Sequence, residues 1–491
     1  MSHVYVDFGA VRIQQYLTRT AGLRGHRAAS NTLAWATTDD VIREVVNDLA
    51  EINTDAGEAD GVVSLRIPVE AGTDTAELIR RLQDSVFAHL RTALPGAEFH
   101  SMWGEGDSYL TVYAQVLEPK VRRGEVRRDL PPTAEFPLAV PCRMCHTDPA
   151  VGTEPLPDEP KALCLDCSMR NVSRRQIMAD DHSPEGRLRS ALGLKPAPND
   201  FAELAALGGA QSGRNHLATV SVDGNAFGVF FKALAEEADA DANAQWGKAA
   251  ISRSLSEATR TALANATLEL PLTTEHERLC VVPHVVGGDD VLVSLPADQA
   301  WAFTLTFLRE FGRLVHEKTA AILDELNASR AKRAGLPALR APTASAGVVF
   351  AHARYPLNLL VESAGRCLSE AKKEFGGRQA SVQWLDITAD GTDAPKHKPL
   401  ALSALWDAGG METRAAAALS GLAKVGASHR ARLTEALRGS GPLTAAAIAH
   451  RVGHLDAVQP FLSPFDQPEQ PPETGIELGA ALGLARWWPC A

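Results

Sequence analysis

The sequence predicts an α+β protein in which two units repeat one order of strands and helices, with a cysteine-rich module between them and a helical segment after them. Two observations support this fold class. Apolar residues recur at every second position in some stretches and at every third or fourth position in others, as in strands and helices respectively. Each unit also starts with a strand that ends in an aspartate, Asp7 in the first unit and Asp223 in the second. This repeated plan predicts a duplicated domain.

The first unit is expected to alternate strands with helices. A short strand at Val4–Phe8 precedes a largely helical stretch at residues 11–49. Apolar and polar residues alternate over Val63–Val69, which predicts a half-buried strand. Leucine and valine recur every four residues over Leu78–Leu90, which predicts one face of a helix. The unit should close with two strands joined by a turn at Gly104–Ser108.

Four of the seven cysteines form a pattern typical of a zinc ribbon. The spacing C-x2-C, eighteen residues, C-x2-C lets four thiolates converge on one tetrahedral ion. The loop between the two pairs is rich in Pro, Asp and Glu, so the metal would serve as the core of this module. Because the protein supplies all four ligands, the Zn²⁺ is expected to be structural. The predicted ligands are Cys142, Cys145, Cys164 and Cys167.

The second unit repeats the strand and helix signals. A strand that ends in Asp223 is followed by a helix, and a long polar helix is predicted at residues 242–266. Two apolar strands flank the tetrapeptide Gly-Gly-Asp-Asp at residues 287–290 and should form a hairpin. Trp301–Val315 predicts an amphipathic helix, and Ala344–Phe375 predicts a strand followed by a helix.

These signals divide the chain into five segments. The predicted limits are a first unit at residues 1–118, a cysteine module at 119–185, a helical connector at 186–212, a second unit at 213–395, and a helical domain at 396–491.

Length and charge narrow the possible functions. A chain of 491 residues is too long for one core and predicts about three domains. The formal net charge of −11 argues against a protein that holds nucleic acid through its overall field, so any RNA contact must be local or shared with partners. Basic clusters at Lys120–Arg128 and Ser173–Arg175 are either solvated charge or such local contacts. Neither a membrane span nor a secretory signal is found, so a cytoplasmic protein without membrane contact is expected.

Three carboxylates are expected to meet at one edge of the second sheet. Asp223 ends a strand, while Asp289 and Asp290 lie at the turn of the hairpin. Such carboxylates repel one another unless cations lie between them, and hard oxygen ligands favour Mg²⁺ or Mn²⁺. Gly287 and Gly288 would permit a tight turn and a close approach of nucleotide triphosphate to the backbone. The residues therefore predict a two-metal nucleotidyl-transfer site; solvated turn carboxylates are the alternative.

At this point the chain resembles a known family. The segments VDGNAFG (Val222–Gly228), GGDDVLVSLP (Gly287–Pro296) and SAGVVFAHARYPLNLLVESAGRCLSEAKK (Ser345–Lys373), together with the four cysteines, resemble the large polymerase-like subunit of type III CRISPR effector complexes. The resemblance covers roughly residues 1–400. It implies two ferredoxin-like palm domains, as in polymerases and nucleotidyl cyclases, with a zinc-ribbon insertion and a C-terminal helical domain.

The resemblance also implies an activity, which is the joining of ATP through 3′–5′ bonds into cyclic oligoadenylate. Synthesis would start when the guide RNA of the complex pairs with a target RNA, so other subunits and both RNAs are the expected partners. The first palm would hold a second ATP as acceptor and looks non-catalytic, because Asp107 lacks a paired carboxylate. The implied metal ligands are Asp223, Asp289 and Asp290, and the implied nucleotide contacts are Gly287, Gly288, Gly224, Asn225, Lys372 and Lys373.

Two departures from the family pattern affect these expectations. Asn225 stands where the family often has a second acid, which leaves Asp223 as the sole carboxylate of its strand end. The palm pattern starts at Val4, so an N-terminal HD nuclease domain and its DNA cleavage are not expected. Two other interpretations stay open: a GGDEF-like nucleotidyl cyclase of another kind, and a non-catalytic structural subunit of an RNA-guided complex.

Overall fold

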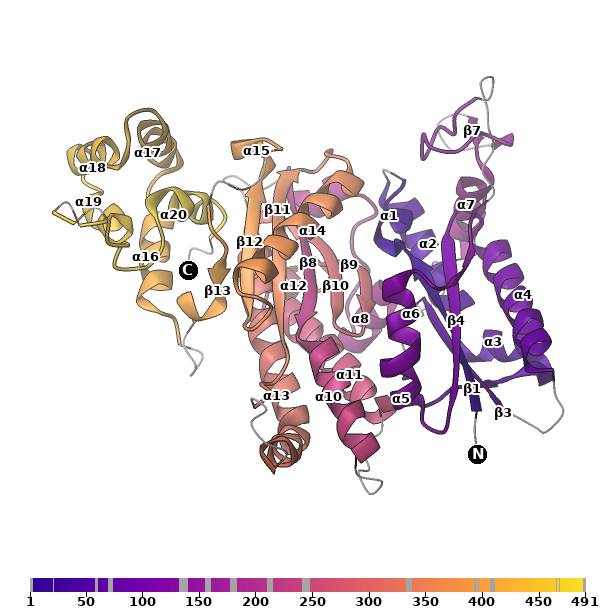
Figure 1. The fold of residues 1–491 in the computed structure, drawn as a ribbon. Coiled ribbons are helices and arrows are strands. Elements are labelled where there is room, and N and C mark those ends of the chain that lie inside the picture. The colour runs from indigo at the N-terminus through magenta and orange to yellow at the C-terminus, as the bar shows by residue number, and fades with distance from the viewer. Residues whose placement is uncertain are drawn as a thin grey trace.

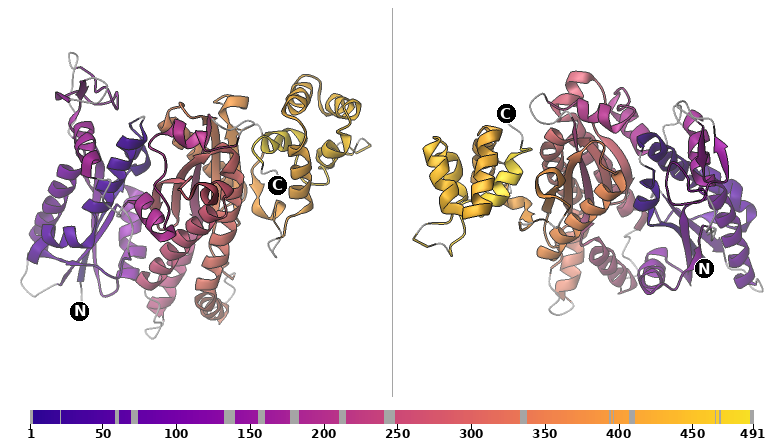
Figure 2. Two further views of the ribbon diagram at one scale, coloured as in Figure 1. Left: turned by 180° about the vertical axis from the view of Figure 1, so that it is seen from behind. Right: turned by 90° about the horizontal axis from the view of Figure 1, so that it is seen from above.

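The computed structural model arranges the chain as three lobes in a row (Figures 1 and 2). The first sheet and its helices form one outer lobe, the second sheet and its helices form the middle lobe, and C-terminal helices form the other outer lobe. The structure describes residues 3–20, 22–57, 61–68, 74–131, 140–154, 160–176, 183–209, 215–240, 248–332, 338–392, 395, 397–406, 411–464, 466–467 and 469–488.

The first sheet is antiparallel and has the strand order β2-β3-β1-β4-β5. Alternate residues of β1 face opposite sides, because Val4, Val6 and Phe8 pack under the helices of one face while Tyr5 packs on the other. The strands are β1 (His3–Val11), β2 (Glu51–Ile52), β3 (Val62–Pro68), β4 (Glu98–Gly106) and β5 (Arg127–Asp129). The helices that follow β1 and β3 are α1 (Ile13–Leu17), α2 (Leu23–Ala36), α3 (Asp39–Val46) and α4 (Thr75–Ala93). The sheet thus extends past the limit of 118 predicted for the first unit.

The hairpin predicted around Gly104–Ser108 is wrong. β4 ends at Gly106, and the chain continues as α5 (Tyr109–Val112), a π-helical turn (Tyr113–Leu117) and α6 (Glu118–Arg123). The β-branched and aromatic residues of this stretch suggested a strand, but they bury a helical face against Tyr5 and Met102. Gly104 permits the close packing, since a Cβ there would lie 2.7 Å from Val112 Cγ1.

The second sheet has the order β13-β12-β11-β8-β10-β9, and only β11 and β12 run parallel. Its first strand and its hairpin lie as predicted, whereas the parallel strand β12 was not predicted. The strands are β8 (His216–Asn225), β9 (Val282–Gly287), β10 (Asp290–Pro296), β11 (Thr343–His352), β12 (Ser381–Asp386) and β13 (Leu400–Ala401). The helices are α10 (Phe227–Ala240), α11 (Lys248–Leu268), α12 (Pro271–His276), α13 (Ala300–Lys332), α14 (Leu357–Glu374) and α15 (Ile387–Asp390). The start of the helix predicted at 242–266 lies outside the described residues.

Helices cover both faces of the second sheet. Val348 and Phe350 of β11 belong to the core shared with α13, while Val349 and Ala351 pack against α14 on the opposite face. Gly347 lets α14 lie directly on β11, because a Cβ there would lie 2.1 Å from the carbonyl oxygen of Ala364. This contact holds the middle of α14 on β11.

The remaining elements connect these units. The cysteine module contains β6 (Gly152–Glu154), β7 (Lys161–Leu163) and α7 (Leu165–Gln176), and the connector contains α8 (Pro184–Leu192) and α9 (Phe201–Ala206). Short 3-10 helices occur at Asn47–Leu49, Ala297–Gln299, Leu402–Ala404 and Gln459–Phe461. The C-terminal lobe contains α16 (Arg414–Ala423), α17 (Ala427–Ser440), α18 (Pro442–Arg451), α19 (Leu455–Val458) and α20 (Leu478–Ala485).

The end of the chain packs back onto the second sheet. The Trp487 ring stacks on Phe350 at 5.5 Å between centroids, and its Nε1 donates a hydrogen bond to Asp386 Oδ2 at 2.8 Å. Arg486 Nη1 lies 3.0 Å from the same carboxylate oxygen. Within the described ranges, we find no helix whose length and hydropathy would let it cross a membrane.

Candidate active site and metal centre

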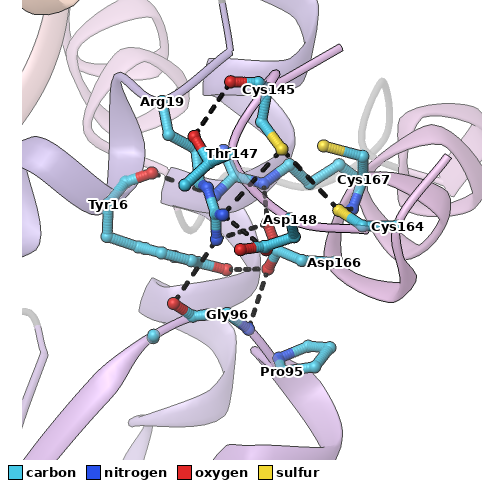
Figure 3. Close-up of polar contacts among 12 residues, drawn as sticks. Tyr16, Arg19, Pro95, Gly96, Cys145, Thr147, Asp148, Cys164, Asp166 and Cys167 are labelled. Carbon is cyan, nitrogen blue, oxygen red and sulfur yellow. Dashed lines mark hydrogen bonds and ion pairs between the residues drawn. The ribbon is translucent and has the colours of Figure 1, made fainter. Parts of the chain in front are cut away.

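The four predicted zinc ligands lie together. All four sulfur atoms lie within 4.8 Å of one another, and Cys145 Sγ and Cys164 Sγ are 3.8 Å apart. Figure 3 shows the sulfur atoms of Cys145, Cys164 and Cys167 in one cluster. The hydrophobic cluster here consists of the four cysteines and Leu163, with Met144 against it, so the module has almost no apolar core of its own. Four buried thiols in this arrangement fit a structural Zn²⁺.

The three predicted carboxylates of the second sheet also converge. β10 pairs with β8 from Val291 opposite Val222, so the next positions, Asp290 and Asp223, lie side by side. Asp289 bends over the end of β8, where a Cβ on Gly224 would lie 2.3 Å from Asp289 Oδ2. Glycine at position 224 therefore leaves room for this carboxylate.

The turn of the hairpin consists of two residues. Asp290 pairs with Gly287, so Gly288 and Asp289 form the loop. Gly288 has a φ of 60°, a conformation that residues with a side chain rarely adopt. Thr259 Oγ1 on α11 donates a hydrogen bond to the Gly288 carbonyl oxygen at 2.6 Å, which holds the turn from outside the sheet.

Burial and neighbouring carboxylates raise the pKa of Asp289 and of Asp290. The pKa of Asp290 is raised by loss of hydration, by the charges of Asp223 and Asp289, and by a hydrogen bond with Asp223 that favours the protonated form. Asp290 is nevertheless an exposed residue, so the neighbouring carboxylates are the firmer cause of this shift in its pKa. The pKa of Asp289 is raised by loss of hydration and by Asp223. The site therefore holds more negative charge than its surroundings balance.

Lys372 is the one predicted nucleotide contact that touches these carboxylates through its side chain. It lies near the end of α14, and its ammonium group forms an ion pair with Asp223 and donates a hydrogen bond to the Gly224 carbonyl oxygen at 2.7 Å. Its charge lowers the pKa of Asp289. The ammonium group stands where a cation is expected, which fits a site that attracts metal ions or the positive groups that replace them.

The carboxylate oxygens of Asp223, Asp289 and Asp290 are not as close together as the ligand atoms of a metal site built from protein groups alone. Within the described part of the chain, the four cysteines are the only group of three or more potential ligands whose ligand atoms lie within 4.8 Å of one another. The chemistry of the donors fits Mg²⁺ or Mn²⁺, which keep several waters and take their remaining ligands from nucleotide phosphates.

Two other predicted contacts are placed differently. Asn225 is buried, and its Nδ2 donates hydrogen bonds to Ser345 Oγ at 2.9 Å, Thr343 Oγ1 at 3.1 Å and the Gln379 carbonyl oxygen at 3.1 Å. This carboxamide thus joins β8 to β11, and its predicted nucleotide contact stays a prediction. Lys373 is exposed on α14.

The matching aspartate of the first sheet has a different environment. Asp7 is buried, with hydrogen bonds from Ser64 Oγ at 2.5 Å and from the Tyr109 hydroxyl at 2.8 Å. Tyr113, one turn further along, lies between the two palms: burial raises its pKa, and so do Glu118, Asp7 and Asp289. The segment misread as a strand therefore includes a residue of the first unit that lies near the acidic turn of the hairpin.

A cavity of about 240 Å³ lies between the first sheet and α8 and α11. Arg260 lines it and directly follows Thr259, which holds the turn at Gly288. The polar and charged lining includes Thr37, Thr38, Asn53, Ser64, Arg187 and Arg260. The sequence did not reveal Arg187, Arg260, Thr259 or Tyr113, because single polar residues on amphipathic helices carry no distinct signal.

The first basic cluster is paired with acids. Arg127 contacts Asp84, and Arg128 lies 3.9 Å from Glu98. Arg122 forms an ion pair with Glu118 one turn away on α6. These partners favour the interpretation of solvated, structural charge. The side chains of Ser173–Arg175 lie outside the described residues.

Comparisons with known proteins agree with this geometry. Residues 216–382 match the family described as Cas10/Cmr2, second palm domain. The solved apo Csm1–Csm4 cassette is similar with a TM-score of 0.56 at 14% identity, covering 99% of this chain and 70% of that chain. The cassette in complex with cA4 has a TM-score of 0.55 at 13% sequence identity, and the match covers 99% of this chain and 69% of that chain. The cassette in complex with one ATP has a TM-score of 0.55 at 12% sequence identity, and the match covers 99% of this chain and 70% of that chain. A search of curated proteins found no match.

The class defined by fold and site is a duplicated palm protein with a four-cysteine module. The second palm is of the Cas10/Cmr2 type, and the resemblance to the palm subunit of type III CRISPR complexes is confirmed. At these identities the likeness to solved structures concerns the fold, so the activity of this chain is a matter for proposal.

Proposed function

We propose that this chain is the RNA-activated nucleotidyltransferase of a type III CRISPR antiviral complex and converts ATP into cyclic oligoadenylate with release of pyrophosphate. The observation that carries the proposal is the meeting of Asp223, Asp289 and Asp290 at the rim of the second sheet, where the raised pKa values of Asp289 and Asp290 call for cations. Similar structures contain ATP, pppApA, cA3 and cA4, which supports the same chemistry here.

The residues divide the reaction between the two palms. Asp223, Asp289 and Asp290 would hold two Mg²⁺ or Mn²⁺ ions, which when bound activate the attacking 3′-hydroxyl and stabilise the leaving pyrophosphate. The 3′-oxygen of one ATP bonds to the α-phosphorus of the other, and the bond from that phosphorus to pyrophosphate breaks. Gly287 and Gly288 leave the backbone open to the triphosphate. The Lys372 ammonium group would leave its ion pair with Asp223 and bind phosphate oxygens of the nucleotide instead.

The acceptor nucleotide would occupy the cavity between the palms. Arg187 and Arg260 line it with positive charge and Asp39 with negative charge, while Asn53 and Ser64 of the first palm are hydrogen bonded to each other. Arg260 of the lining directly follows Thr259, which holds the Gly288 turn, so the helix that carries Arg260 joins the cavity to the hairpin.

The proposed partners are other subunits of the complex, and guide and target RNA through them. Similar structures are of Csm1 with Csm4, one of them described as a subcomplex of the type III-A CRISPR–Csm interference complex. The net charge of −11 fits a subunit whose neighbours carry most of the RNA.

The test is ATP turnover by the assembled complex with Mn²⁺, with and without target RNA. We expect cyclic oligoadenylate and pyrophosphate only when target RNA is present. Asp290→Asn should lower the rate about a thousandfold, because loss of a metal ligand removes several kcal/mol of transition-state stabilisation. Asp107→Asn, an exposed carboxylate of the first palm, is the matched control and should leave the rate within about twofold.

The outcomes distinguish the alternatives. Synthesis that survives Asp290→Asn would contradict the proposed site. A guanylate product from GTP alone would indicate a GGDEF-like cyclase. Absence of product from every nucleotide would favour the structural subunit, an interpretation that the Lys372–Asp223 ion pair supports because it already places a cation beside the carboxylates.

A further inference from the structure

The cysteine module is joined to the first palm by a buried polar network around Asp166. This residue lies between two zinc ligands in the sequence, and its side chain is only 3% exposed. Its Oδ1 accepts hydrogen bonds from the Tyr16 hydroxyl at 2.6 Å and from the Gly96 backbone N–H at 3.2 Å (Figure 3). Asp166 thereby connects the module to two separate segments of the first palm.

Arg170 is the second member of the network. Its Nε donates to Asp166 Oδ2 at 2.8 Å, and its side chain is 2% exposed. Its other nitrogens donate to the carbonyl oxygens of Tyr16 at 2.9 Å and Leu17 at 3.3 Å, and its guanidinium lies over the Tyr16 ring at 4.5 Å. It also donates to the Gly25 carbonyl oxygen at 3.5 Å. Arg170 therefore fixes the corner between α1 and α2.

Arg19 adds a third link, which involves a zinc ligand directly. Its Nη2 lies 2.5 Å from Asp148 Oδ2 and 3.9 Å from Cys145 Sγ, and its Nη1 lies 3.5 Å from the Gly96 carbonyl oxygen (Figure 3). A thiolate that holds a metal ion is thus a neighbour of the same cation that ties the module to the palm.

The first half of α2 also contacts the strand that leads to the acidic turn. Ser30 Oγ donates to the His284 carbonyl oxygen at 3.2 Å, and the rings of His26 and His284 lie 4.4 Å apart. His284 belongs to β9 and shares a hydrogen bond of 2.7 Å with Ser294 Oγ of β10. α2 therefore touches both the corner that Arg170 fixes and the hairpin that bears Asp289 and Asp290.

The contact between His26 and His284 includes buried polar atoms that destabilise it. Among the described residues, His26 Nε2 and His284 Nδ1 are buried without a hydrogen-bond partner. Burial of unpaired polar atoms costs free energy, so the contact depends on other interactions that hold α2 in place. The network of Asp166 and Arg170 is such an interaction, and the module that carries it has little core besides its four thiols.

We propose that Asp166 and Arg170 are positioning residues through which the metal-loaded cysteine module holds α2 against the catalytic hairpin. Loss of the metal would unfold the module, release α2 and loosen the hairpin without touching the three carboxylates. The link is the path from Asp166 and Arg170 through α2 to the hairpin, and it does not depend on the activity of the protein. Its effect on oligoadenylate synthesis rests on the proposed function.

Hydrogen–deuterium exchange on the full chain tests the link. On removal of the metal with a chelator, amides of residues 23–36 and 282–296 should exchange about tenfold faster, while those of 414–485 should not change. Faster exchange confined to residues 140–176 would overturn the proposal.

A variant separates the network from the metal itself. Asp166→Asn should bind one zinc per chain and still give faster exchange at 282–296, because the thiols stay while the charge that orders Arg170 is lost. Glu154→Gln is the matched control, since Glu154 accepts a hydrogen bond from Ser168 Oγ inside the module; it should leave the hairpin unchanged. If Asp166→Asn loses zinc, Tyr16→Phe, which removes one hydrogen bond to Asp166, replaces it in the same test. Normal exchange at 282–296 in a zinc-loaded variant would overturn the role of Asp166.

The link and the proposed function fail in different ways. If exchange responds as expected but no nucleotide is converted, the link holds and the function fails. If the wild-type complex makes oligoadenylate and Asp166→Asn makes it at the same rate with unchanged hairpin exchange, the link fails and the function holds.

Discussion

The two palms place an aspartate on the first strand of each sheet but surround it differently. In the first palm, Asp7 is buried and accepts hydrogen bonds from Ser64 and Tyr109. In the second palm, Asp223 faces Asp289, Asp290 and the ammonium group of Lys372. The Asp7 carboxylate is hydrogen bonded by hydroxyl groups. Asp223 belongs to a cluster whose negative charge is neutralised only in part by protein groups.

This difference follows from the segments that adjoin the neighbouring strands. In the second palm, β9 returns as β10 through a turn with two adjacent acids. In the first palm, β4 passes into α5, and the tyrosine of that helix covers Asp7. The second sheet thus has a metal-seeking rim. The first strand does not end in Asp7 as predicted: β1 continues to Val11, and Asp7 lies inside the sheet opposite Ser64 of β3 and Met102 of β4, in a closed, structural setting.

Removing the charge of Asp223 should have the largest effect on the difference between the two palms. Asp223→Asn should lower oligoadenylate synthesis about a thousandfold, since a metal ligand is lost. Its effect on the free energy of unfolding should stay within about 1 kcal/mol, because the ion pair with Lys372 is partly exposed and screened by solvent. Activity and urea unfolding measured on the same preparation check this, and full activity would refute the assignment.

Asp7→Asn should give the opposite pattern. Two hydroxyl groups lose a charged acceptor in a buried site, so the free energy of unfolding should fall by about 1–3 kcal/mol. Synthesis by the folded fraction should change far less than in Asp223→Asn. If Asp7→Asn abolished synthesis without loss of stability, the first palm would hold a catalytic acid after all.

Acidification should loosen the contact between the palms. Burial, with a contribution from Arg27, lowers the pKa of His284 to about 3, and burial also lowers the pKa of His26. An unfolded histidine binds a proton near pH 6.5, so the unfolded state takes up more protons between these values. Stability is therefore complete above about pH 6.5 and is lost as the pH falls, by about 2 kcal/mol at pH 5 from His284 alone.

Urea unfolding at pH 7 and pH 5 measures this loss. His284→Gln should show a smaller difference between the two pH values than wild type, whereas His276→Gln, at an exposed histidine, should match wild type. Equal pH dependence in wild type and His284→Gln would mean that the contact between His26 and His284 is not the group that titrates.

The sequence predicted those features that depend on local pattern. The spacing of Cys142 to Cys167, the strand that ends near Asp223 and the Gly-Gly-Asp-Asp turn each have a short-range signature, and the structure brings them together as expected. The stretch after Gly104 was misread, because β-branched and aromatic residues also occur on buried helical faces. Whether it forms a strand or a helix is decided by packing on a distant strand.

The residues that join the parts were not predictable. Arg260, Tyr113 and Asp166 owe their positions to contacts between segments far apart in the chain. A single polar residue on a helix looks the same in the sequence whether it meets solvent, a cavity or another domain. The parallel pairing of β12 with β11 likewise depends on where α14 packs.

Mn²⁺ binding, followed by electron paramagnetic resonance in the presence of a non-hydrolysable ATP analogue, tests the central claim most directly. The chain should bind two Mn²⁺ ions, with an affinity that falls as the pH is lowered, because protons compete for Asp290, whose pKa is raised by burial and by its neighbouring carboxylates. The triple variant Asp223→Asn, Asp289→Asn and Asp290→Asn should bind neither ion. Equal Mn²⁺ binding by wild type and the triple variant would contradict the account.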